Sequence, residues 1–223
     1  MIRKYLAAIL LMLCQICAFG EGRVYTKKAR LEDFPSRTTR VVLTGLEVFD
    51  TVLKQEISSR WMVSPYEFCT VTDYTRDRYT DLYYFVRFTF DSDFTYMTLT
   101  KGGDTDDENQ LKQGFDVVMI PIAPAYMTGG DELVFLPAYI DIMQEYITKA
   151  MASERVAFRG LKSLCSKPSG VILTDRQEAI SAFLAAEADK NAKVVITSSS
   201  SKKSIEMIIT TDTHELRRIK KKR

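Results

Sequence analysis

The chain has 223 residues, of which 46% are hydrophobic and 27% charged. This is the ordinary composition of a folded protein, with enough residues for one large α/β domain or two small ones. Lys and Arg number 31 against 29 Asp and Glu, so no chain-wide excess of charge points to nucleic acid as a partner.

The first twenty residues predict a cleavable secretory signal peptide. Arg3 and Lys4 form a short positive segment, an apolar run covers 5–17, and Ala18 and Gly20 place small residues three and one before a cut near Gly20. The apolar run is shorter than the roughly 20 residues that span a bilayer. We therefore expect a periplasmic or secreted protein whose mature chain has no transmembrane segment.

The rest of the chain divides by composition into three parts. Residues 21–39 are polar, lack a sustained period and predict a linker, and residues 40–211 carry the patterns of a folded α/β domain. Residues 212–223 form a basic tail, with positive charge at six of the last seven positions. A frayed, solvated end is expected there. The tail has no aromatic residue for base stacking, so export and composition both argue against nucleic acid.

The domain opens on a strand followed by an amphipathic helix. The apolar run 41–43 is rich in β-branched residues and predicts a buried strand. Thr44 and Glu47 have the spacing of a capping box, and the helix they would open runs from 46 to 61 with one apolar stripe.

Further strands and helices follow in alternation. Asp91 and Asp93 supply turn residues between two strands, which predicts an antiparallel hairpin. Pro137 must kink or restart the helix that contains it, a capping box at 174–177 opens a later helix, and 155–169 is irregular. Strands are predicted at 66–72, 82–90, 95–100, 117–122, 171–173, 194–197 and, as an edge strand, 205–211, and helices at 131–153 and 176–189.

These elements predict an α/β (or α+β) domain with a mixed sheet and amphipathic helices packed on it. A strand, a capped helix and a further strand occur at both ends of the domain. This hints at two related halves, although no clear internal sequence repeat is present.

Cysteine usage follows from the compartment. Cys14 and Cys17 lie in the leader after bulky residues, which disfavours a lipid anchor. Cys69 and Cys165 remain after cleavage, and an oxidising compartment allows a disulfide between them. Nothing in the sequence fixes their distance, so the pairing stays open.

Motifs for catalysis, metal binding and cofactor binding are absent from the sequence. His214 is the only histidine and lies beside the basic tail, where a mobile side chain would be a poor general base. Two cysteines and one histidine make a weak zinc set. No phosphate-binding glycine loop occurs, and the acidic stretch 104–108 lacks the EF-hand spacing. We therefore expect no cofactor.

Carboxylates and tyrosines gather between 66 and 84. Carboxylates beside aromatic rings are typical of sugar-binding sites and of glycosidases, in which two carboxyl groups stand a fixed distance apart. Packing in the sheet and core is the simpler explanation. The residues of this candidate ligand region are Tyr66, Glu67, Asp73, Tyr74, Asp77, Asp81 and Tyr83.

The stretch RWMVSPYEF at 60–68, which follows the leader, the short strand and the amphipathic helix, resembles a pattern in uncharacterised exported proteins of Bacteroidales-type bacteria. The resemblance covers 40 to about 200 and implies compartment and fold class only, since no activity is known for those proteins.

Because nucleophile, base and metal sets are missing, the sequence favours a non-catalytic binding or interaction module of the cell envelope. Its partner would be an envelope protein or a small ligand. The alternative is a carboxylate-based hydrolase of the glycoside type, acting through the tyrosine-rich region 66–84. A hydrolase should place two carboxyls in one cleft and raise the pKa of one of them.

Overall fold

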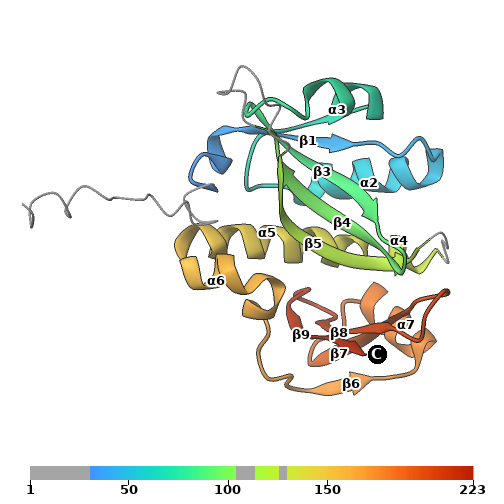
Figure 1. Cartoon of the computed structure of the whole chain (residues 1–223). Coiled ribbons are helices and arrows are strands. Elements are labelled where there is room, and N and C mark those ends of the chain that lie inside the picture. The colour runs from blue at the N-terminus through green and yellow to red at the C-terminus, as the bar shows by residue number, and fades with distance from the viewer. Residues whose placement is uncertain (1–30, 104–113, 126–129, 223) are drawn as a thin grey trace, which may run out of the picture.

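A computed structural model describes residues 31–103, 114–125 and 130–222, and the chain forms two mixed sheets with helices packed against them (Figure 1). The predicted α/β class is confirmed, with two sheets in place of one. Sheet A has the strand order β2-β1-β3-β4-β5, and sheet B has the order β6-β7-β8-β9. The strands are β1 (Thr38–Val42), β2 (Tyr66–Cys69), β3 (Tyr83–Phe90), β4 (Phe94–Lys101), β5 (Phe115–Pro124), β6 (Val171–Leu173), β7 (Lys190–Thr197), β8 (Ser204–Thr210) and β9 (Leu216–Lys222).

Helices α2 and α5 bury their apolar stripes together with one face of sheet A in the main core. Pro137 lies in the first turn of α5, so the predicted long helix is restarted there. The predicted helix 176–189 ends earlier, at Leu184. The helices are α2 (Glu47–Arg60), α3 (Val71–Asp77), α4 (Asp131–Val134), α5 (Leu136–Ala152), α6 (Glu154–Arg159) and α7 (Arg176–Leu184), with short 3-10 turns η2 (Phe34–Ser36) and η3 (Gly160–Ser163).

The first helix begins differently from its prediction. Its N-cap is Leu46, which makes no side-chain cap bond, so the capping box of Thr44 and Glu47 is wrong. The carboxylate of Asp50 instead accepts hydrogen bonds from the Thr44 amide and hydroxyl, both at 2.8 Å, and from the Gly45 amide at 2.9 Å. A buried acid in the first turn therefore fixes the loop that leads into α2.

The strands of the two sheets are connected and paired in the same order. Strand β1 pairs in parallel with β3, which continues into the antiparallel strands β4 and β5. Strand β6 likewise pairs in parallel with β7, which continues into the antiparallel strands β8 and β9. Strand β2 is an addition beside β1. The topology thus supports the hint of two related halves: a first half with β1–β5 and a second half with β6–β9.

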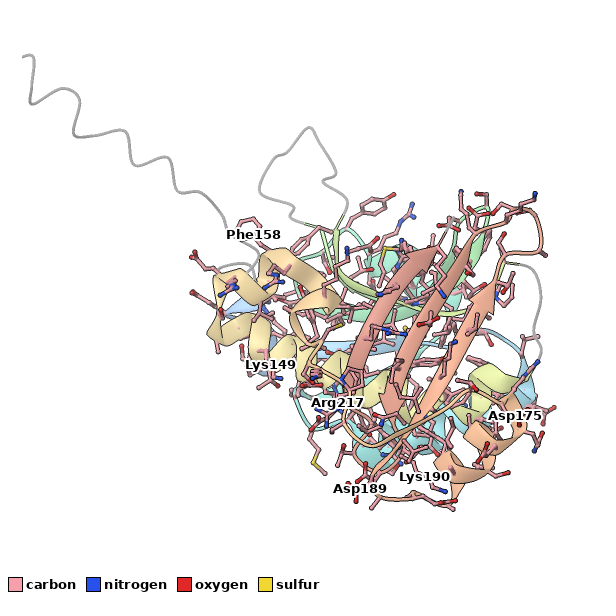
Figure 2. The ribbon with its side chains drawn as sticks, turned by 90° about the horizontal axis from the view of Figure 1, so that it is seen from below. Lys149, Phe158, Asp175, Asp189, Lys190 and Arg217 are labelled. Carbon is pink, nitrogen blue, oxygen red and sulfur yellow. The ribbon has the colours of Figure 1, made fainter. Side chains whose placement is uncertain are left out.

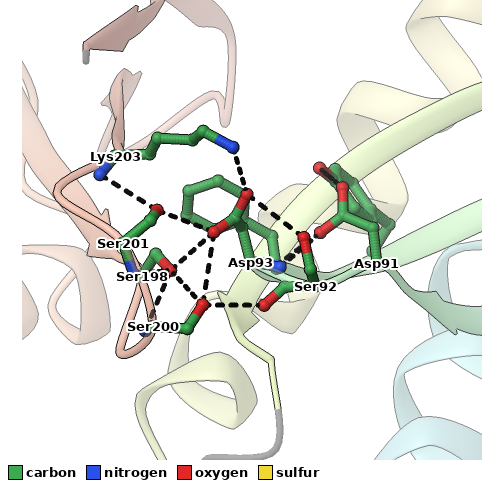
Figure 3. Close-up of polar contacts among 9 residues, drawn as sticks. Asp91, Ser92, Asp93, Ser198, Ser200, Ser201 and Lys203 are labelled. Atoms are coloured by element: carbon green, nitrogen blue, oxygen red, sulfur yellow. Dashed lines mark hydrogen bonds and ion pairs between the residues drawn. The ribbon is translucent and has the colours of Figure 1, made fainter.

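The equivalent hairpins of the two halves meet at their tips (Figure 3). Asp93, between β3 and β4, is only 6% exposed. Its carboxylate accepts hydrogen bonds from the hydroxyls of Ser198 at 2.9 Å and Ser201 at 2.7 Å, and pairs with the Lys203 ammonium at 2.6 Å. Lys203 and the hydroxyls hold the pKa of Asp93 well below its usual range. We call these four residues the hairpin-tip cluster.

The boundaries predicted for the linker and the domain are wrong at 31–39. Leu31 and Phe34 are fully buried, and the Phe34 ring meets Tyr84 edge-on with centroids 4.7 Å apart. Asp33 accepts a hydrogen bond from the Tyr84 hydroxyl at 2.7 Å. The segment is mostly polar, but its few apolar side chains are buried in the core, so the folded part begins before residue 40. Residues 1–30, with the predicted signal peptide and its cut, lie outside the described residues.

The basic tail is also ordered, because residues 216–222 form β9 along the edge of sheet B. The prediction of a frayed end is therefore wrong. Strand β8, predicted as an edge, is an interior strand between β7 and β9. The segment predicted as irregular at 155–169 contains most of α6 and all of η3.

Candidate functional site

A groove of about 940 Å³ runs between β5 and β9, the last strands of the two sheets. Its apolar lining comes from both halves, with Val117, Val118 and Met119 on β5 and Ile219 on β9. Met119 is 40% exposed, although it stands in the middle of a strand. The volume falls in the upper range of ligand sites. Figure 1 shows sheet B below β5, with α6 to one side.

The groove walls are strongly basic. Arg159 at the end of α6 and Lys162 in η3 stand on one side, and Lys220, Lys221 and Lys222 stand on β9. All five are exposed. Among the described residues, no carboxylate forms an ion pair with any of them except Lys222. Four exposed cations therefore stand around an apolar floor, and none of them has an ion-pair partner in the part of the chain that the structure describes.

Both acidic residues of the groove are already engaged. Asp91 accepts hydrogen bonds from the backbone amides of Asp93 and Phe94 and from the Tyr96 hydroxyl. Burial alone would raise the pKa of Asp91, but these donors hold it below its ordinary value. Asp116 accepts from Thr100 at 2.7 Å and pairs with Arg87 at 3.3 Å. Arg87 neutralises Asp116, whereas Asp91 keeps its negative charge among neutral donors. The four unpaired cations outnumber it, so the described lining of the groove is positive overall.

Lys222 belongs to a second cluster, on sheet B. Glu206 of β8 is 2% exposed and pairs with Arg218, with Lys222 at 2.7 Å and with Lys193 at 3.5 Å. The hydrogen bond from Lys222 and the neighbouring cations lower the pKa of Glu206 to about 2. This carboxylate crosses the strands to hold β9 against β8, and so positions one wall of the groove. Figure 2 shows β7, β8 and β9 from below.

The predicted ligand region 66–84 divides into separate contacts. Arg40 of β1 pairs with Glu67 and Asp77, and its guanidinium lies 3.8 Å from the centroid of the Tyr83 ring. The hydrogen bonds from Arg76, and then those from Arg40, lower the pKa of Asp77 to about 2. The cluster thus joins two carboxylates around a cation, and the lowered pKa of Asp77 is the opposite of what a general acid needs.

The other members of the predicted region lie apart from that cluster or serve the fold. Tyr66 packs against Phe68 and the main core, Asp73 closes a capping box with Thr70, and Asp81 pairs with Arg37 at 3.5 Å. Tyr74 meets Phe85 edge-on at 5.1 Å. The structure gives the hydrolase alternative no observation in its favour.

His214 is held in place, contrary to the expectation of a mobile side chain. Its Nδ1 lies 2.6 Å from Asp141, which also pairs with Arg60 at 2.9 Å, and its ring stacks on Phe183 with centroids 4.8 Å apart. Its φ of 57° is in the left-handed region. In the described ranges, no hydroxyl or thiol hydrogen-bonds to the ring. The contacts anchor the β8–β9 turn to α5.

Cys69 and Cys165 are both free thiols, so no disulfide joins them here. Cys69 is buried with Val42 and Phe85 on the α3 side of sheet A, and burial raises its pKa to about 11. Cys165 follows η3 and its sulfur donates to the Leu161 carbonyl at 3.7 Å. Both thiols are protonated at neutral pH and packed as small apolar groups.

The described part of the chain contains no cluster of three or more His, Cys, Asp or Glu side chains that would hold a metal ion. The acidic stretch 104–108 lies outside it. No helix in that part is both long and apolar enough to cross a membrane.

Sequence reasoning missed the groove, because its two walls are brought together only by the packing of the halves. The basic run near the chain end was the available signal. The sequence pattern of that run predicts a frayed, solvated end, and Ile219 is its one apolar residue.

No protein-family model matches the chain, and no curated protein or solved structure matches it either.

Proposed function

We propose that this protein is an exported, non-catalytic binding module of the cell envelope, and that its site is the groove between β5 and β9. The partner is a protein that presents an acidic segment. The observation that carries this proposal is a set of four exposed cations around an apolar floor that form no ion pair with any described residue: Arg159, Lys162, Lys220 and Lys221.

Charge and shape together favour a protein segment as the occupant. The cations stand on both sides of an open groove, so they match charges distributed along a chain. The apolar floor at Val117, Met119 and Ile219 would cover apolar side chains of the partner. Burial of apolar surface stabilises a complex by roughly 25 cal/mol per Å². An apolar centre with a polar rim is the usual anatomy of a protein interface.

The test is a charge-reversal experiment with a defined probe. A fluorescein-labelled decapeptide that alternates Glu and Val is titrated against the wild type and against a Lys220→Glu, Lys221→Glu variant. Lys54→Glu, Lys202→Glu is the matched control, since it changes the net charge equally on α2 and on the β7–β8 turn. We expect at least about tenfold weaker binding for the groove variant alone.

Binding should also weaken as salt is raised from low concentration to 0.15 M and above, where charges are screened beyond about 8 Å. Equal affinities of wild type, groove variant and control would contradict the proposal. Export is tested separately by sequencing the N-terminus of the protein from cell fractions. A periplasmic or secreted chain that begins near residue 21 supports export, and a cytosolic chain that begins at Met1 contradicts it.

A further inference from the structure

Part of the outer edge of β9 is open to another strand. Strand β9 is the last in sheet B, so in the described chain its outer backbone groups have no strand partner. In an antiparallel sheet, successive residues of a strand direct their backbone N–H and C=O to the two sides in turn, so every second residue bonds to the same neighbouring strand. The Ser198 amide donates to the Lys203 carbonyl at 2.9 Å, which fixes the phase of this alternation in β7 and β8.

By this alternation the backbone of Glu206 does not bond to β7, so it bonds to β9. Lys220, the register partner of Glu206, therefore directs its backbone N–H and C=O toward β8. The backbone N–H and C=O of Lys221 then point outward, into the groove. The next outward amide, that of Ile219, is hydrogen-bonded to the Cys165 thiol. The edge is therefore blocked at one end by Cys165 and open at Lys221.

The facing edge of β5 is unsuited to a strand. Pro121 lacks a backbone N–H, and register shifts interrupt the ladder near Pro121 and again near Asp116. Both features are usual protections of an edge against pairing. An added strand would consequently bond to β9 and lie against the apolar side chains of β5.

From this geometry we infer that the acidic partner segment binds as an extended strand added to sheet B along β9, with Lys221 as the backbone contact and the groove cations contacting its carboxylates. This rests on the proposed function and specifies its mode of recognition. Main-chain bonds supply affinity in such complexes, and side chains supply specificity. A second copy of β9 is a poor occupant, because Lys220 and Lys221 would face lysines of the same kind.

The test separates the backbone of Lys221 from its charge. Lys221→Pro removes the outward N–H and the charge, whereas Lys221→Gln removes the charge alone. Neither change touches a backbone group that bonds to β8. Both variants are titrated with the Glu/Val decapeptide, and thermal melting checks that both fold. A second peptide, N-methylated at alternate residues, is titrated against the wild type, so that the question is answered even if the proline variant does not fold.

We expect Lys221→Gln to bind within about threefold of the wild type and Lys221→Pro at least about tenfold more weakly. One of the two N-methylation phases should abolish binding. Equal affinity of both variants, together with unchanged binding of both N-methylated peptides, would overturn strand addition while leaving charge-driven binding intact. A wild type that binds no peptide would overturn the proposed function itself. A wild-type dimer in analytical ultracentrifugation that Lys221→Pro dissolves would assign the edge to a second copy and also overturn the inference.

Discussion

The carboxylate of Asp93 accepts a hydrogen bond from the Ser198 hydroxyl at 2.9 Å, although the two residues are 105 positions apart in the chain. Each lies at the tip of the hairpin that occupies the same place in its half. The contact joins sheet A to sheet B at one end of their interface. At another part of that interface, the groove separates β5 from β9.

Replacement of Asp93 by Ala should loosen the two halves. The change leaves three serine hydroxyls and the Lys203 ammonium without their shared acceptor. We expect the melting temperature to fall by about 4 °C or more. Asp93→Asn keeps an acceptor of the same shape and should cost less. Differential scanning calorimetry of the three proteins checks this order, and an Ala variant as stable as the wild type would show that the hairpin-tip cluster does not hold the halves together.

Glu206 should make stability depend on pH in the acidic range. Its pKa is lowered from 4.5 to about 2 in the folded protein, so the unfolded chain binds its proton first as the pH falls. The stabilisation is complete above about pH 5 and is lost progressively between pH 4.5 and 2. Urea unfolding of wild type and Glu206→Gln across pH 2–6 measures this contribution. The difference in stability between the two should shrink at the lowest pH, and a constant difference would contradict the assignment.

Asp50 should be needed for the loop that enters α2. Asp50→Ala removes three hydrogen bonds to a buried carboxylate and leaves the amides of Thr44 and Gly45 unpaired. We expect a loss of about 2–4 kcal/mol in the free energy of unfolding. Thr44→Val, which removes only the hydroxyl bond, should cost about 1 kcal/mol. If both variants unfold at the wild-type urea concentration, the loop is held by other contacts.

Truncation should show that β9 is structural. A chain that stops after Thr213 loses Leu216 and the cations that neutralise Glu206. This change should leave the buried carboxylate of Glu206 with Lys193 alone, at 3.5 Å, and expose the edge of β8. We expect loss of cooperative melting in the second half, seen by hydrogen exchange at β7 and β8. Removal of Arg223 alone is the control, and a truncated protein with wild-type protection would restore the frayed-tail interpretation.

Local patterns predicted much of the fold. The aromatic and β-branched alternation at Leu82–Phe90 and the apolar run at Val171–Leu173 correspond to β3 and β6. Strand β3 pairs with β4, the next strand in the chain, and β6 pairs with β7, one helix away. The sequence could not separate two sheets, because the division depends on which edges pair over long distances.

The groove could not be predicted from local sequence patterns, for a related reason. Strand β9 has a register shift opposite Ile208 and Ile209, so Leu216 and Ile219 stand three residues apart and the period of two is broken. Its remaining residues are lysines and arginines, which are typical both of solvated ends and of protected sheet edges. Only the pairing with β8 distinguishes these interpretations.

The shared strand connectivity of the two halves also suggests the order in which they fold. Each meander, β3–β4–β5 and β7–β8–β9, pairs strands that follow one another directly, so most strand pairing closes short loops. Only the parallel pairs β1–β2, β1–β3 and β6–β7 require a crossover. We therefore expect two kinetic folding units that form independently, with the docking of one preformed unit on the other as the last and slowest step.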